Sequence, residues 1–512
     1  MDPLASLASL AHGFSIALTP TNLLFVLIGV TLGQLIGALP GIGPSAGMAL
    51  LLPITFGLDP ITALVMLSGI MYGGMYGGTL TSVLVNVPGE AASVMTAVDG
   101  NQLARQGRAG QALAAAAIGS FLAGIASVIA LVFLTPPLSA FALNFSAPEY
   151  FLLALLGITA TASLGSGSAV KAMIGATLGL MIALVGTDPI QGTSRLTFGS
   201  LELLEGIDFL PVAIGVFGIA EILVSMEQTQ SGQVIRTRLR DMWLTGKDWA
   251  ECRMAIVRGG TVGLLIGLMP GAGPTVAALL AYVVEKKASP HPERFGHGAL
   301  DGVAAAESAN NSAAHGSMIP MLALGIPGSA STAVLLAALV LLGIRPGPML
   351  LTEQADLVWG LIASMFIGNV ILLVMNLPLA PLFASVLRIP YSYLVAGILI
   401  VSLVGAYAIS LSLFNVGLTL FFGMVGYLMI RADIPRAPLV LAVVLAPLME
   451  SSLRQSLMLS EGSPTIFVER PLSAVLALMV LLSLTLPLLS FLLARRAARR
   501  AGVAEALSHS SD

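Results

Sequence analysis

Long apolar runs separated by short polar links dominate the chain over nearly all of its 512 residues. Many of the runs have, or nearly have, the length that a helix needs to cross a hydrocarbon layer of about 30 Å. They are Leu23–Gly37, Ala112–Leu134, Phe209–Met226, Leu357–Met375, Tyr391–Ile409, Leu413–Ile430 and Leu472–Leu493. The pattern predicts an all-α polytopic membrane protein with roughly ten to twelve crossings, some of them interrupted.

Composition supports this interpretation and narrows the range of functions. Only 10% of the residues are charged and 56% are hydrophobic, whereas a soluble protein has about a quarter of its residues charged. The single cysteine, Cys252, excludes an internal disulfide. Residues 1–20 contain no Lys or Arg, so they lack the basic region that begins a cleavable signal peptide. The net charge of −3 points to no nucleic-acid partner.

One motif occurs twice and divides the chain into two halves. Pro40-Gly41-Ile42-Gly43-Pro44 recurs in the middle of the chain as Pro270-Gly271-Ala272-Gly273-Pro274. Each copy is followed by a second Pro-Gly turn, at Pro88-Gly89 and at Pro327-Gly328. The interval between motif and turn is longer in the second half, where a polar stretch, Glu285–His297, is added. Repeated helix breakers in apolar surroundings are the sequence pointer to the binding site of a transporter.

Basic residues gather in clusters that the positive-inside rule assigns to the cytoplasm. The clusters are Arg105 and Arg108; Arg236, Arg238, Arg240, Lys247 and Arg253; Lys286, Lys287 and Arg294; Arg431 and Arg436; and Arg495, Arg496, Arg499 and Arg500. The N-terminus, which lacks Lys and Arg, is then periplasmic and the C-terminus cytoplasmic. The second copy of the motif follows the cytoplasmic linker, so its first helix travels outward. The two copies are therefore predicted to form an inverted repeat of broken transmembrane helices and re-entrant hairpins.

This topology predicts five segments. Residues 1–226 form the first repeat and 227–255 a cytoplasmic linker, and 256–457 form the second repeat. Residues 458–494 contain an extracytoplasmic loop and one extra C-terminal transmembrane helix. Residues 495–512 are a polar cytoplasmic tail.

Chemistry is expected at the helix breaks. Free N–H groups at helix N-termini attract anions, and carbonyls released by a break suit Na⁺. Asn310 and Asn311 lie on a polar stripe before the second Pro-Gly turn and could line the substrate path. The candidate substrate- and cation-binding residues are Gly41, Gly43, Ser45, Asn86, Pro88, Gly89, Glu90, Ser93, Gly271, Gly273, Thr275, Asn310, Asn311, Pro327, Gly328, Ser329, Ser331 and Thr332. A Na⁺ position is expected at Asn86, Ser45, Thr275 and Ser329, although any single hydroxyl could instead bond its own backbone.

Glu90 directly follows a Pro-Gly turn, and an ionisable group at membrane depth is a functional candidate by default. Its counterpart in the second half is Ser329, so the turn itself does not require an acid. Three interpretations stay open. Glu90 could receive a proton, help to hold a cation, or sit in interfacial water as an acid of the first helical turn.

The sequence contains no pattern typical of an enzyme. It has no Walker loop, no HExxH, no cysteine-based metal site and no plausible Ser-His-Asp set. We therefore expect neither catalysis nor a cofactor. Without an ATP-binding segment, the driving force must be an ion gradient, of Na⁺ or alternatively of H⁺, or an external partner.

Several motifs, in this order, resemble one family of transporters. They are Gly33-Gln34-Leu35-Ile36-Gly37-Ala38-Leu39-Pro40-Gly41-Ile42-Gly43-Pro44, Tyr72-Gly73-Gly74-Met75-Tyr76-Gly77-Gly78, Asn86-Val87-Pro88-Gly89-Glu90, Pro270-Gly271-Ala272-Gly273-Pro274, Glu307-Ser308-Ala309-Asn310-Asn311, Gly325-Ile326-Pro327-Gly328 and Glu450-Ser451-Ser452-Leu453-Arg454-Gln455-Ser456-Leu457. The chain is similar in these motifs, and over nearly its whole length, to the large membrane subunit of the tripartite tricarboxylate transporters (TctA-type).

The resemblance implies a cation-coupled importer of tricarboxylates or other carboxylates in the bacterial inner membrane. It implies two partners, a small four-helix membrane subunit and a periplasmic solute-binding protein that delivers the substrate. An elevator-like movement with alternating access is expected by analogy with other inverted-repeat importers. Two alternatives remain: a stand-alone secondary carboxylate transporter that needs no binding protein, and a channel.

Overall fold

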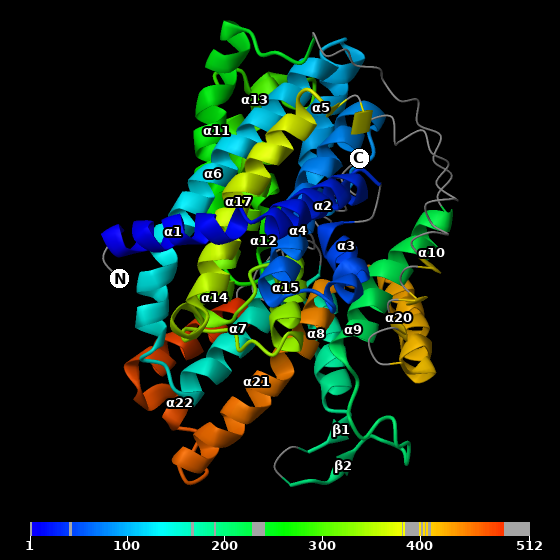
Figure 1. The fold of residues 1–512 in the computed structure, drawn as a ribbon, viewed down its shortest axis with the longest axis vertical. Coiled ribbons are helices and arrows are strands. Elements are labelled where there is room, and N and C mark those ends of the chain that lie inside the picture. The colour runs from blue at the N-terminus through cyan, green and yellow to red at the C-terminus, as the bar shows by residue number, and fades with distance from the viewer. Residues whose placement is uncertain are drawn as a thin grey trace, which may run out of the picture.

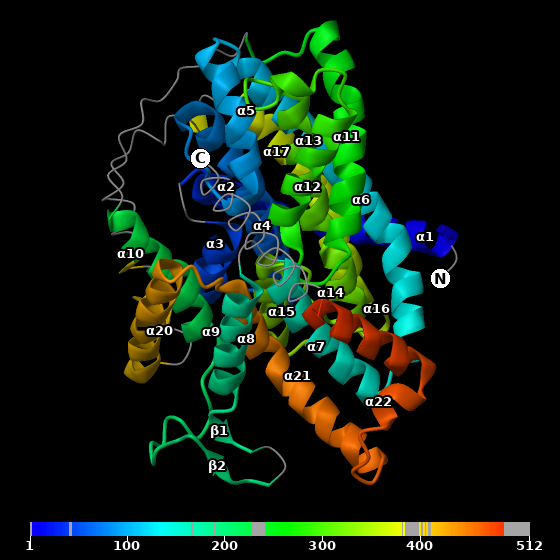
Figure 2. The same cartoon turned by 180° about the vertical axis from the view of Figure 1, so that it is seen from behind.

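The computed structural model describes residues 3–39, 43–164, 168–188, 191–227, 241–380, 382–383, 399–400, 403–404, 406–407 and 411–485. These residues are helical apart from short connections and one two-stranded antiparallel hairpin, in which Gly186 pairs with Arg195. The prediction of an all-α polytopic membrane protein is confirmed. Most of the helices run along the long axis of the molecule, and α1 lies across it (Figures 1 and 2).

The first half contains the elements α1 (Pro3–Ala17), α2 (Pro20–Gly37), α3 (Pro44–Leu51), η1 (Leu52–Thr55), α4 (Pro60–Val85), η2 (Ala91–Ser93), α5 (Val94–Arg105), α6 (Ala109–Ala142), α7 (Ala147–Leu164), α8 (Ala169–Ala183), β1 (Gly186–Thr187), β2 (Ser194–Arg195), α9 (Phe209–Ala213), η3 (Ile214–Ile219, a π-helical segment) and α10 (Ala220–Glu227).

The second half contains α11 (Gly246–Gly267), α12 (Gly273–Ala288), η5 (Pro292–Arg294), α13 (Leu300–Gly316), α14 (Met318–Leu324), α15 (Ala330–Leu341), α16 (Leu350–Glu353), α17 (Ala355–Asn376), α20 (Leu413–Arg431), α21 (Ala437–Leu459) and α22 (Ile466–Glu469). A further apolar helix covers Pro471–Thr485.

Six helices of the described chain are long and apolar enough to cross a membrane: α2, α4, α6, α17, α20 and α21. Shorter apolar helices include α3, α7, α8 and α15, and the interruption of membrane crossings stays a prediction. The expected run Tyr391–Ile409 lies mostly outside the described residues, and residues 486–512 lie wholly outside them. The number of crossings, the segment boundaries and the orientation therefore stay predictions.

Proline begins several of these helices for a local reason. Pro20, Pro60 and Pro438 stand in the first turns of α2, α4 and α21. The ring fixes φ near the helical value, and the N–H that proline lacks would have no partner in the first turn. Helix α11 starts at Gly246, within the stretch expected to be the linker, because Thr245 and Asp248 form a capping box there.

Two helix pairs, α2 with α4 and α11 with α13, pack so closely that only glycine fits on one side. A Cβ atom added to Gly33 would lie 2.6 Å from the carbonyl oxygen of Ile70, and one added to Gly263 would lie 2.4 Å from that of Ala309. The same register recurs one turn away on each side. The contacts are Gly29–Met66, Gly33–Ile70 and Gly37–Gly74 in the first pair, and Gly259–Ala305, Gly263–Ala309 and Gly267–Ala313 in the second.

These contacts have the same register relative to the sequence motifs in both halves. The last glycine of each series, Gly37 or Gly267, stands at the same interval before its Pro-Gly-x-Gly-Pro motif. The residues that these glycines contact likewise stand at the same interval before the downstream Pro-Gly turn. Small residues allow this approach between helices in a membrane, where van der Waals packing replaces the hydrophobic drive. The two halves therefore share one packing arrangement, while the opposite threading of the copies stays a prediction.

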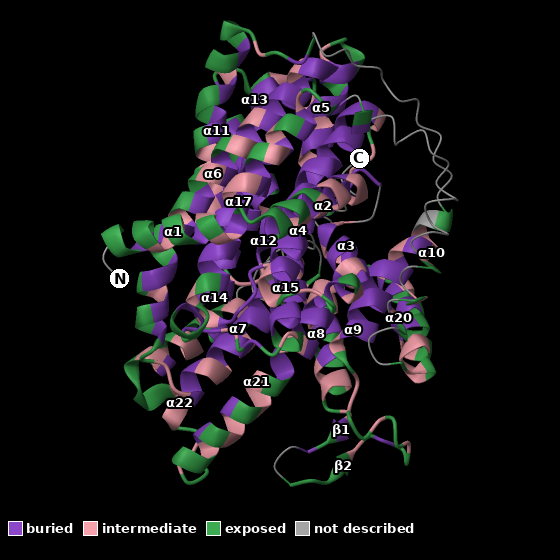
Figure 3. Cartoon of the chain, in the orientation of Figure 1, coloured by how far each residue is buried: buried purple, intermediate pink, exposed green. Residues whose placement is uncertain are grey.

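The interior of the molecule is built on α4 and α13. All 17 residues of α13 are buried, including its polar ones, and 94% of the most apolar window of α4 is buried. Figure 3 shows the buried residues along the centre and the exposed ones toward the ends and outer helices. Polar side chains of α13 are thus held away from both lipid and bulk water.

Replacing Gly263 by Ala should destabilise the protein, because the added methyl group meets the Ala309 carbonyl oxygen and forces the helices apart. Overpacking of this kind costs about 1–3 kcal/mol. The matched control is Gly417→Ala in α20, where nothing lies within 4 Å of the added atom and helix propensity favours alanine. Thermal unfolding in detergent should show a clearly lower midpoint for Gly263→Ala only. Equal midpoints for the two variants would contradict the close packing.

Candidate functional site

The first Pro-Gly-x-Gly-Pro motif ends where α3 begins. Gly43 precedes the helix in an extended conformation, with φ −71° and ψ 168°, and no side chain caps the first turn. The N–H groups of that turn, which starts at Pro44 and Ser45, have no partner within the helix. Residues 40–42, and with them the expected site residue Gly41, lie outside the described residues.

The second copy of the motif is a turn held by two left-handed glycines. Gly271 has φ 77° and Gly273 has φ 65°, a conformation that residues with a Cβ atom rarely adopt. A Cβ atom at Gly271 would lie 2.0 Å from the Thr161 hydroxyl. The turn therefore packs directly on α7, and α12 starts immediately after it.

The two downstream Pro-Gly turns have the same local geometry. Asn86 ends α4 with φ 60°, and Gly325, at the equivalent position of the second half, ends α14 with φ 72°. After each turn the chain is extended at Glu90 or at its counterpart Ser329. The N–H of Glu90 donates to Ser93 Oγ at 3.3 Å, and the N–H of Ser329 donates to Thr332 Oγ1 at 2.9 Å.

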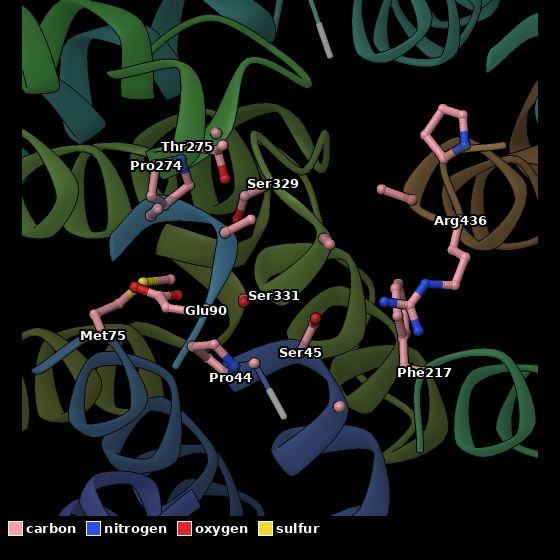
Figure 4. A pocket seen from close by; sticks show the side chains of 18 of the residues that line it. Pro44, Ser45, Met75, Glu90, Phe217, Pro274, Thr275, Ser329, Ser331 and Arg436 are labelled. Carbon is pink, nitrogen blue, oxygen red and sulfur yellow. The ribbon is translucent and has the colours of Figure 1, made fainter. Parts of the chain in front are cut away.

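These breaks surround one cavity of about 580 Å³. The first turns of four helices face it: α3, α12, α15 and α21. Figure 4 shows the hydroxyls of Ser45, Ser329 and Ser331 between Glu90 on one side of the cavity and Arg436 on the other. Because each helix N-terminus carries about half a positive charge, the arrangement attracts an anion.

Arg436 supplies the cavity with a full positive charge. Its guanidinium lies 2.7 Å from a carboxylate oxygen of Glu221 and donates to the carbonyl of Val216 at 3.1 Å. Its carbon Cζ sits 5.7 Å from the ring centre of Phe217. Val216 and Phe217 belong to the π-helical segment η3, a distortion that often marks functional sites.

Most of the expected site residues meet at this cavity. The residues that line it are Gly43, Ser45, Pro88, Gly89, Glu90, Gly271, Gly273, Thr275, Ser329 and Ser331. The expected residues that do not line it are Asn86, Ser93, Asn310, Asn311, Pro327, Gly328 and Thr332. Of the four expected Na⁺ ligands, Ser45, Thr275 and Ser329 are brought together, whereas Asn86 is an exposed cap of α4. Their binding roles stay predictions.

Two of the residues outside the lining lie behind it. Asn310 donates through Nδ2 to the Oε1 oxygen of Glu90 at 3.0 Å. Asn311 donates to the hydroxyl of Ser120 at 2.7 Å. Glu90 is only 8% exposed, which argues against the interpretation of a freely solvated acid of the first helical turn.

Sequence reasoning missed Arg436 and Glu221, because it counted Arg436 only among the cytoplasmic charges. The position of Arg436 relative to the helix α21 could have identified it as a site residue. Arg436 stands at the N-cap of α21, where a cation opposes the helix dipole. An arginine at this position is compatible with a stable helix when an anion lies beside it, and Glu221 is the anion in this structure.

Water-soluble thiol reagents should reach the cavity but not the residues behind it. Cys252 is buried, so the unmodified chain should give little background. We expect Ser329→Cys and Thr275→Cys to react with a small maleimide in detergent, and Ser312→Cys, at a fully buried position of α13, to stay unmodified. Rapid labelling at position 312 with none at 329 would contradict this geometry.

Comparison with known proteins assigns the chain to a family. The model of the "Tripartite tricarboxylate transporter TctA family" matches residues 23–441. A protein of Agrobacterium vitis named "Uncharacterized 52.8 kDa protein in TAR-I ttuC' 3'region" is 45% identical over 490 residues, which are 96% of this chain and 98% of that protein.

A second Agrobacterium vitis protein, named "Uncharacterized protein in TAR-II ttuC' 3'region", is 44% identical over 234 residues, covering 46% of this chain and 97% of that protein. No solved structure matches the chain. The family is one of transporters, and its model spans both copies of the repeated motif. The chain belongs to the tripartite tricarboxylate transporter TctA family.

Proposed function

We propose that this chain is the transporting subunit of a cation-coupled secondary importer of tricarboxylates or other carboxylates. It binds the substrate in the cavity lined by the helix breaks and moves it by alternating access. A periplasmic solute-binding protein delivers the substrate, and a small four-helix membrane subunit completes the assembly in the inner membrane. Membership of the TctA family supports a tripartite transporter with other subunits.

The observation that carries this proposal is the convergence of four helix N-termini and Arg436 on one cavity. Unpaired N–H groups in a first turn donate to carboxylate oxygens without adding a fixed charge. A guanidinium adds a planar pair of donors that matches a carboxylate. A substrate with several carboxylates can therefore be held at both ends, by Arg436 on one side and by the serine-rich helix ends on the other.

The pairing of Arg436 with Glu221 suits a site that must also release its substrate. An arginine that already has an acidic partner binds a carboxylate by exchange, so the net gain in free energy is smaller than for an unpaired cation. Moderate affinity is what a carrier needs, because a site that binds too tightly cannot unload.

The site also explains why the helix breaks occur in pairs. A non-helical backbone inside a membrane is stable only within protein or beside a water-filled cavity. The equivalent turns of both halves meet at the same place, as in transporters built from internal repeats. We propose that one group of helices carries this cavity across the membrane in an elevator-like movement, with the N-terminus periplasmic and the C-terminus cytoplasmic.

Uptake of labelled carboxylates into proteoliposomes tests the proposal. The chain would be reconstituted with its small subunit, with and without the binding protein, under a Na⁺ gradient or a proton gradient. Saturable uptake that requires the binding protein and one gradient supports it. Uptake by this chain alone would indicate a stand-alone transporter, and ohmic current without saturation would indicate a channel.

Replacing Arg436 by Gln should reduce uptake at least tenfold, because the cavity loses its positive charge and keeps both acids. Arg436→Lys should retain part of the activity, since it restores the charge without the planar donor pair. The control is Arg431→Gln, which removes an exposed arginine that pairs with Glu227 away from the cavity. Thermal unfolding of each variant shows that the protein remains folded. Wild-type uptake by folded Arg436→Gln would contradict the assigned substrate position.

A further inference from the structure

A cluster of buried polar side chains lies between α13, α4, α5 and α6, behind the cavity. Its centre is the carboxylate of Glu307, which is fully buried. The hydroxyl of Thr96 donates to Oε1 at 2.5 Å and that of Ser120 donates to Oε2 at 3.4 Å. Thr79 of α4 adds a third hydroxyl contact. Hydrogen bonds donated by three hydroxyls favour the ionised form of this carboxylate.

The second carboxylate of the cluster is Glu90, which also lines the cavity. Asn310 links the two acids, since it stands one helical turn after Glu307 and donates to Glu90 at 3.0 Å. Among the described residues, neither carboxylate has a Lys, Arg or His partner. Two ionised acids in the interior without a positive partner carry a large cost in free energy, which is relieved either by protonation or by a cation bound beside them.

Unpaired oxygen atoms in the same cluster point to the kind of cation. The Oδ1 atoms of Asn310 and Asn311 are buried and have no hydrogen-bond donor. Both belong to amides whose nitrogens already contact the cluster, at Glu90 and at Ser120. The Tyr76 hydroxyl, one turn before Thr79 on α4, is likewise buried without a partner. Carboxylate, amide and hydroxyl oxygens together form the ligand set of a hard cation.

We propose that Glu307, Glu90, Asn310 and Asn311 form a binding site for one Na⁺ ion, behind the cavity that holds the substrate. The site is distinct from the Na⁺ position expected from sequence at Asn86, Ser45, Thr275 and Ser329. The hydroxyls of Thr79, Thr96 and Ser120 hold the Glu307 carboxylate in place, and the two amide oxygens complete the ligands.

Glu90 connects this site to the cavity. When the cation site is empty, the negative charge of Glu90 faces the space that an anionic substrate would occupy, and the two repel each other. A Na⁺ ion beside Glu90 removes this repulsion, so each ligand raises the affinity for the other by the same factor. This linkage rests on the proposed carboxylate site, whereas Na⁺ binding itself does not.

Binding of radioactive ²²Na⁺ to the purified full chain in detergent, without substrate, tests the site. The wild type should bind ²²Na⁺ in competition with unlabelled Na⁺ but not with K⁺. Glu307→Gln keeps the side chain's shape and removes its charge, so the half-saturating Na⁺ concentration should rise at least tenfold. Asn310→Leu, which removes one amide oxygen and the N–H donor to Glu90, should raise it as well. Glu307→Asp should recover part of the affinity.

Ser45→Ala and Asn86→Gly serve as controls, because they change the position expected from sequence, and glycine keeps the left-handed turn before Glu90. Wild-type affinity in both, with loss in Glu307→Gln, supports the proposal. Loss in the controls with wild-type affinity in folded Glu307→Gln would overturn it. Absence of ²²Na⁺ binding by the wild type, with uptake driven by a proton gradient, would also overturn it and make the acids proton carriers.

The same preparation separates this proposal from the proposed function. If the protein binds Na⁺ but shows no saturable carboxylate uptake in proteoliposomes, the proposed cation site is supported and the proposed importer function is contradicted. If folded Glu307→Gln keeps Na⁺-driven uptake and its Na⁺ affinity is unchanged, the importer function is supported and the proposed cation site is contradicted.

Discussion

The fold depends on one constraint, which is that backbone groups released by a helix break at membrane depth need partners. Four helices of this chain begin inside the molecule, and their first turns face the same cavity. The breaks are held open by short-range geometry that only some residues allow, such as the left-handed glycines Gly271 and Gly273. The close packing of α2 on α4 and of α11 on α13 fixes where these turns lie. An anion site follows from this backbone arrangement before any side-chain charge is added.

Local signals in the sequence were sufficient for most of the long helices and for part of the cavity lining. Apolar runs predicted the long helices, and the duplicated Pro-Gly motifs predicted where helices would be interrupted. Ser45, Thr275 and Ser329 were expected at the site because small hydroxyls follow the breaks, and all three line the cavity. The glycine spacing of Gly29, Gly33 and Gly37 was also visible in the sequence, and its recurrence from Gly259 onward could have fixed the register of both helix pairs.

Contacts between distant segments could not be predicted in the same way. Arg436 meets Glu221, which lies in the other half of the chain, only because α21 starts beside the π-helical segment η3. Glu90 and Asn310 also come from different halves, and no pattern in either segment specifies their hydrogen bond. Asn86 was expected among the ligands because it precedes a Pro-Gly turn, yet the structure uses it as a left-handed cap. Asparagine is one of the few residues with a side chain that tolerates this conformation, so the motif predicted a turn more securely than a ligand.

The charges around the cavity lie at different depths, and this order bears on how an anion is held. Arg436, with its partner Glu221, and the helix N-termini face the open space. Glu90 also borders this space, whereas Glu307 lies deeper. An anion site alone would need no acids behind it, because buried carboxylates weaken the attraction of an anion by the surrounding dipoles. Their presence is consistent with a site in which the anion is held well only when a positive charge is also present. In a carrier this dependence is the physical basis of coupling, because the empty and fully loaded states are then favoured over the singly loaded ones.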